Sequence, residues 1–141
     1  MDDLVDLALD HALGADAEPG TALASAPIAE LMLAMYRHLT RHPWSCQVIA
    51  LRAPCGPHYG ALSERICVLL EERSARDALG TSSALSNFVL GSATTAQVAA
   101  RERSAPVDPE RAPTYARLHA AHSAQPEELV AAGIRALLLA A

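Results

Sequence analysis

The hydrophobic residues of this chain recur mostly at helical spacing, in segments that prolines separate from one another. The clearest case is residues 28–42, which begin after Pro27 and stop at Pro43. A proline disfavours helix in the residue before it, so these two positions bound the segment. The spacing predicts an amphipathic helix with one apolar face, made of Ile28, Leu31, Met32, Met35, Tyr36 and Leu39.

Five further segments have helical character, and so does one shorter segment. We expect helices over 2–14, 43–51, 57–72, 77–102 and 126–141, with a short segment around 115–122. Acidic first turns favour the starts of the first and last, and Gly14 suits a C-cap. Proline and glycine predict loops over 15–27 and 103–113. No strand pattern competes, so the sequence predicts an all-α domain of about six or seven helices.

The stretch SNFVLGSATTAQ, residues 86–97, is unusual in a chain so rich in alanine and leucine. Its serine, threonine, asparagine and glycine residues are average or poor helix formers, so packing has to compensate. Small residues such as Gly91 and Ser92 would allow close approach of a second helix. Asn87 and Thr95 would offer hydrogen bonds to a bound molecule. A solvated face is the third interpretation, because Ser and Thr are mostly exposed.

Size and charge restrict the function. The 141 residues suffice for one domain, residues 1–141, with a net charge of −5 and scattered arginines. Clustered positive charge is absent, so we expect no direct nucleic-acid binding. No apolar run approaches the length of a membrane span, so we expect no membrane partner. An odd set of three cysteines without a signal peptide predicts reduced thiols and a cytoplasmic location.

Candidate chemistry is sparse. Cys46, Cys55 and His58 could be drawn as a metal site, but a structural zinc site needs four ligands at paired spacings. His119 and His122 share a helical face and are better explained as surface residues. No nucleophile stands beside a base and an orienting acid. The sequence therefore predicts no catalytic residues, no metal and no cofactor.

The order of the elements resembles the C-terminal domain of the tetracycline-repressor (TetR) family of transcriptional regulators. The resemblance rests on RHPW at 41–44, LRAP at 51–54, GPHYGALSERICVLLEE at 56–72, SNFVLGS at 86–92 and the closing EELVAAGIRALLLAA. It implies an all-α bundle with an internal pocket that dimerises through a four-helix bundle. The chain departs from the family by lacking a helix-turn-helix head, and residues 1–14 match only a remnant of the linker helix.

The resemblance also implies positions for the two sites. Ligand-binding residues would be Met35, Ile49, Arg52, Pro54, Tyr59, Arg65, Ile66, Asn87 and Thr95, and dimer-interface residues would be Gly91, Ser92, Ala93, Gly133 and Leu137. Ile49 and Thr95 stand near the positions where the tetracycline repressor binds magnesium, and neither suits that ion. An apolar or aromatic natural product is therefore the expected ligand.

Three functions follow from this interpretation. The first is a small-molecule-binding, homodimeric sensor domain of a TetR-type transcriptional regulator without its DNA-binding head. The second is a stand-alone protein that sequesters a metabolite and so confers resistance. The third is a small enzyme that reuses the pocket for cyclisation or isomerisation, with Tyr59, His58 and Glu64 as the available acid–base groups.

Overall fold

The computed structural model describes residues 2–141, and every regular element in that range is an α helix, which confirms the predicted fold class. Met1, the first residue of the expected linker remnant, lies outside the described residues. The helices are α1 (Asp2–Ala15), α2 (Ala17–Ser25), α3 (Ile28–Arg41), α4 (Pro43–Leu51), α5 (Pro57–Glu72), α6 (Ala78–Ala96), α7 (Ala99–Ser104), α8 (Pro113–Ala121) and α9 (Pro126–Ala140).

Helix α2 occupies the segment that the sequence predicts as a loop, so that prediction was wrong. The carboxylate of Asp16 caps this helix by accepting a hydrogen bond from the backbone N–H of Glu18 at 3.3 Å. Pro19 falls in the first turn, where its missing N–H removes no intrahelical bond. Gly14, expected as a C-cap, lies inside α1, and a Cβ atom there would overlap the ring of His58.

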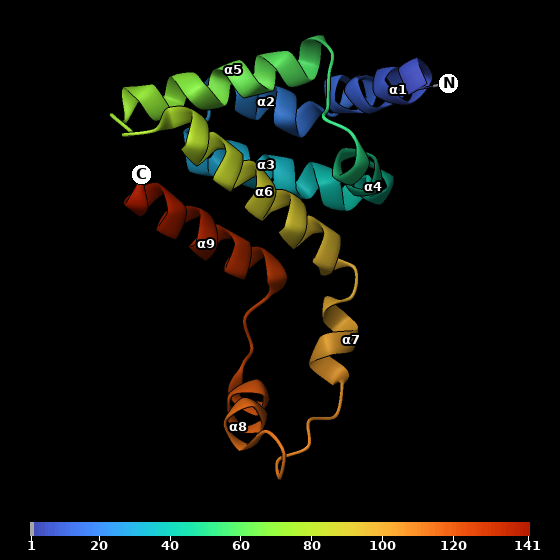
Figure 1. The fold of residues 1–141 in the computed structure, drawn as a ribbon, viewed down its shortest axis with the longest axis vertical. Coiled ribbons are helices and arrows are strands. Elements are labelled where there is room, and N and C mark those ends of the chain that lie inside the picture. The colour runs from blue at the N-terminus through green and yellow to red at the C-terminus, as the bar shows by residue number, and fades with distance from the viewer. Residues whose placement is uncertain (1) are drawn as a thin grey trace.

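Helix α3 lies at the centre of the body, against α2, α6 and α9 (Figure 1). Helix α5 packs on α1 and α6 and closes the other side of the body. Helix α3 buries the face that its spacing predicts, and α5, α6 and α9 add apolar residues to the same core. Its fully buried apolar members include Leu9, Leu31, Leu70, Leu85, Val89, Ala93 and Ile134.

The predicted helix over 77–102 is divided in two. Helix α6 ends at Ala96, and the short α7 begins at Ala99 after a turn. Helices α7 and α8 extend away from the body, joined by an irregular segment over 105–112 (Figure 1). Within α6, Val89 and Ala93 face the core, while the exposed hydroxyls of Thr94 and Thr95 donate to carbonyl groups of the preceding turn.

Candidate functional site

A cavity of about 490 Å³ lies between α3, α4, α5 and α6. Buried apolar side chains from α3, α5 and α6 form its interior, and exposed residues of α6 lie at its opening. The lining residues are Met32, Met35, Leu39, Ile49, Pro54, Tyr59, Leu62, Ser63, Ile66, Cys67, Leu79, Ser82, Ser83, Ser86, Asn87, Val89 and Leu90. A concave apolar site with a few polar groups is the usual form of a small-molecule site.

The structure brings most of the predicted ligand-binding residues to this cavity. Six of the nine line it, namely Met35, Ile49, Pro54, Tyr59, Ile66 and Asn87. Arg52 instead pairs with α1, where its guanidinium lies 3.1 Å from Asp2 and 2.8 Å from Asp6. Arg65 is not among the lining residues, and its Nε atom is buried without a partner in the described chain. Thr95 lies on a different groove.

Serine residues on α6 supply cavity groups that sequence reasoning did not select. Ser82, Ser83 and Ser86 line the cavity together with Asn87. Their spacing places them along one side of α6, so the SSALSN stretch at 82–87 carried a usable signal. Met32 and Leu62 belong to apolar stripes that predict core, and periodicity alone cannot separate a core residue from a cavity-lining one.

Tyr59 is the least exposed of the polar residues that line the cavity. Its side chain is 6% exposed, and its hydroxyl oxygen is buried without a hydrogen-bond partner among residues 2–141. Burial, with smaller contributions from the charges of Asp10 and Cys46, raises the pKa of Tyr59 to about 12. The phenol is therefore neutral at physiological pH. The hydroxyl oxygen has almost no accessible surface, so it faces into the protein and does not offer a hydrogen bond to a molecule in the cavity.

Asp10 of α1 holds the backbone of Tyr59 in place at the start of α5. Its buried carboxylate accepts hydrogen bonds from the backbone N–H groups of His58 at 3.0 Å and Tyr59 at 2.9 Å, and it lies 2.8 Å from His58 Nδ1. Burial opposes ionisation of this carboxyl, but these hydrogen bonds and the His58 charge outweigh it, so the pKa of Asp10 lies below its ordinary value. Helix α1 thus caps α5, one wall of the cavity.

A second, more open groove of about 780 Å³ lies between α6 and α9 on one side and α7 and α8 on the other. Its exposed apolar residues include Tyr115, Leu118 and Leu129, and Phe88, Ser92, Thr95 and Val130 also line it.

The predicted dimer-interface residues occupy different environments. Ser92 lines the groove and is half-buried, Gly91 faces open space, and Leu137 is half-buried. Ala93 is fully buried in the subunit's own core, and Gly133 faces Phe88 of the same subunit. The dimer interface stays a prediction.

Of the groups considered for other chemistry, Tyr59 and Cys67 line the cavity and the others lie apart from it. His58 is half exposed and bound to Asp10, and neither it nor Glu64 lines the cavity. His119 Nε2 lies 3.1 Å from the carbonyl of Glu102 in the projecting arm. The three cysteines are free. None of the helices described between residues 2 and 141 combines the length and the apolar character needed to cross a bilayer.

Comparison with known proteins agrees with this architecture. The family model described as "Tetracyclin repressor-like, C-terminal domain" matches residues 21–132, from α2 into α9. No curated protein and no solved structure matches the chain. The matched range contains all the helices that line the cavity. The chain belongs to the tetracycline-repressor-like C-terminal domain family.

Proposed function

We propose that this chain is the small-molecule-binding, dimerising sensor domain of a TetR-type transcriptional regulator that acts in the cytoplasm. The observation that carries the proposal is the cavity of about 490 Å³, in which apolar side chains lie beside the polar groups of Ser82, Ser86 and Asn87. Membership of the family supports both ligand binding and dimerisation. The enzyme alternative receives no support from His58 or Glu64, because neither of them lines the cavity.

The ligand that fits this cavity is uncharged and largely apolar. No aspartate, glutamate, lysine, arginine or histidine is among the lining residues in the described chain. Arg52, one of the two arginines that the family resemblance places at the ligand, is held by Asp2 and Asp6 instead. Burying an unpaired charge in such a site would be costly. Ser86 and Asn87 would provide one or two hydrogen bonds, which suits an aromatic ligand bearing a carbonyl or hydroxyl group.

Polar contacts connect two helices of the cavity wall, α4 and α5, to α1. Asp10 of α1 caps α5, and Asp2 and Asp6 bind Arg52 at the end of α4. A ligand that moved α4 or α5 would therefore displace the helix that resembles the family's linker. A ligand would shift α1 only if its affinity for the protein differed between the two positions of α1.

Asn87→Trp should weaken the binding of an uncharged fluorescent probe such as N-phenyl-1-naphthylamine. Asn87 is exposed at the opening of the cavity, so an indole there would fill the entrance without disturbing the buried core. Titration of the wild-type protein should give a saturable rise in probe fluorescence, and the variant should lose at least about tenfold in affinity, or about 1.4 kcal/mol.

Ala84→Trp is the matched control, because Ala84 is also exposed on α6 but lines neither cavity. It should bind the probe as the wild type does. Equal binding by the two tryptophan variants, or no saturable binding by the wild type, would contradict the proposed site.

We propose that the groove between α6, α7, α8 and α9 receives a second copy of the chain. Its apolar residues Tyr115, Leu118 and Leu129 are about half exposed, at 58%, 53% and 49%. Solvent-exposed apolar side chains gathered in one groove favour a protein partner. The family is typically dimeric, which selects a second copy as that partner.

Leu129→Glu should convert the proposed dimer to a monomer, because it would bury an unpaired carboxylate between the subunits. The mass is measured by size-exclusion chromatography with light scattering. Leu51→Glu is the matched control, since Leu51 is 85% exposed on α4 and lies outside the groove. A monomeric wild type, or a dimer that both variants retain, would exclude this interface.

A further inference from the structure

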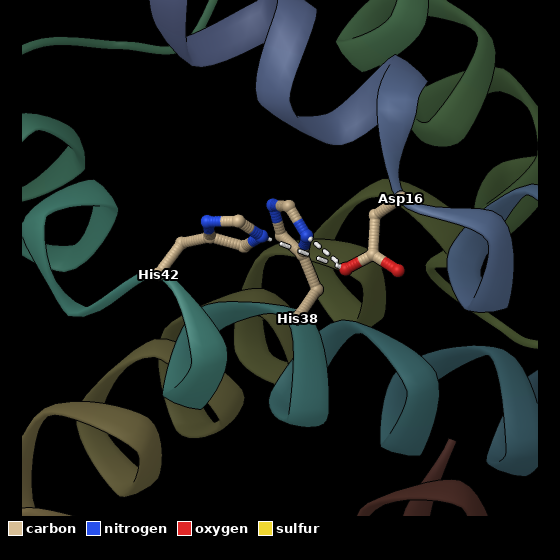
Figure 2. Close-up of side chains that lie close together, drawn as sticks. All are labelled: Asp16, His38 and His42. Atoms are coloured by element: carbon tan, nitrogen blue, oxygen red, sulfur yellow. Dashed lines mark hydrogen bonds and ion pairs between the residues drawn. The ribbon is translucent and has the colours of Figure 1, made fainter.

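Three side chains that sequence reasoning did not select meet where α1, α2, α3 and α4 join. Asp16 stands between α1 and α2, His38 lies in the last turn of α3, and His42 separates α3 from α4. Figure 2 shows both imidazole rings turned toward the carboxylate. One candidate ligand atom from each of the three lies within 4.8 Å of the other two.

Of the two histidines, His38 is within hydrogen-bond distance of the carboxylate and His42 is not. His38 Nδ1 lies 2.8 Å from Asp16 Oδ2, which is a hydrogen bond, but His42 Nε2 lies 3.8 Å from the same oxygen, which is too far for one. Bonds of about 2.0–2.2 Å to a tetrahedral zinc ion would place its ligand atoms about 3.4 Å apart. Small shifts of His42 toward Asp16 and of His38 away from it would therefore accommodate an ion.

Two of the three side chains, His38 and Asp16, are buried or nearly buried, which limits their movement. His38 is fully buried, and Asp16 is 12% exposed, so the fold holds two of the three groups close to the positions that an ion would need. His42 is 34% exposed and leaves one side open, where a water molecule could complete the coordination. We propose that Asp16, His38 and His42 bind a divalent transition-metal ion of the zinc class. Two imidazoles and a carboxylate suit zinc, and magnesium or calcium would prefer oxygen ligands.

Arg41 would compete with a metal ion for the Asp16 carboxylate. Its Nη2 lies 2.7 Å from Asp16 Oδ2, while its Nη1 lies 2.6 Å from Glu18 Oε2. A bound metal would displace only the first of these two ion pairs, and Glu18 would keep the guanidinium in place. The site is separate from the ligand cavity, because none of its residues lines that cavity, so the proposal does not depend on the proposed function.

Zinc binding by the metal-free 141-residue protein tests the proposal directly. Isothermal titration should show one zinc ion per chain, and Co²⁺ as a probe should give the visible absorption of a four-coordinate site. His42→Gln should fold, because this ring is partly exposed, yet lose at least about tenfold in zinc affinity and the cobalt absorption. Arg41→Ala should bind zinc more tightly than the wild type, because the competing cation is gone.

His11→Gln and His122→Gln are the controls, since both residues are exposed and lie outside the cluster. Both should bind zinc as the wild type does. Zinc affinity that is unchanged in His42→Gln, or lost in His122→Gln instead, would overturn the proposal. So would a wild-type protein that neither binds zinc nor gives the cobalt absorption.

Discussion

Gly56→Ala is expected to lower the free energy of unfolding by about 2–4 kcal/mol, because two independent penalties meet at this position. Gly56 precedes α5 with φ 120° and ψ 169°, a conformation that is essentially restricted to glycine and costs other residues about 1–3 kcal/mol. A Cβ atom there would also overlap the carboxylate of Asp10. That carboxylate would have to leave the N–H groups of His58 and Tyr59.

Urea denaturation followed by circular dichroism measures this loss. Gly60→Ala is the matched control, because Gly60 lies inside the same helix with open space around its Cβ position, so alanine should stabilise by up to about 1 kcal/mol. In an Asp10→Ala background the part of the Gly56→Ala penalty that comes from the carboxylate should disappear, while the backbone part and the close contact with the Asp10 Cβ atom should remain. Equal effects of Gly56→Ala and Gly60→Ala would refute this account.

The fold was predictable from the sequence wherever apolar residues recur over several turns. Helix α3 shows this best, because both of its ends carry proline signals and its apolar stripe is the buried face of the structure. Helix α2 was missed because Pro19 and Gly20 are ordinary loop residues. The cap from Asp16 and the packing of α2 on α1 and α3 stabilise a helix there, and packing is not visible in local composition.

The residues that line the cavity were partly predictable. The exceptions are residues that pair with charges elsewhere or that lie on another side of a helix. Arg52 was expected to face a ligand, but α1 brings Asp2 and Asp6 to it from about fifty positions away in the sequence. Such long-range pairing leaves no local pattern. Thr95 shares a helix with Asn87 but lies on a different side of it, at the second groove. Asn87 and the serines were recoverable because they lie on one side within two turns.

The histidine cluster is a different kind of omission. His38 and His42 are four residues apart in HLTRH, a spacing that puts two side chains on one side of a helix. That signal was present in the sequence. The third member, Asp16, lies 22 residues before His38 in a segment predicted as a loop, so the carboxylate could be placed beside the rings only once α2 was known.

The small residues of α6 and α9 were expected to allow close helix contact, and Gly133 provides it within the subunit. A Cβ atom at Gly133 would overlap the tip of the Phe88 ring on α6. Gly133→Ala should therefore destabilise the protein by about 1–2 kcal/mol, even though alanine is the better helix former by about 1 kcal/mol. The half-buried Phe88 would have to leave its place against the core and change the groove that it lines.

Gly20→Ala separates helix propensity from this steric effect, because Gly20 lies in α2 with open space around its Cβ position and should gain stability. Phe88→Leu shortens the opposing side chain, so combining it with Gly133→Ala should cost less than the sum of the two single changes. The coupling is measured by denaturation of all four members of the cycle. If Gly133→Ala stabilised the protein as Gly20→Ala does, α6 and α9 would not need a glycine at their crossing.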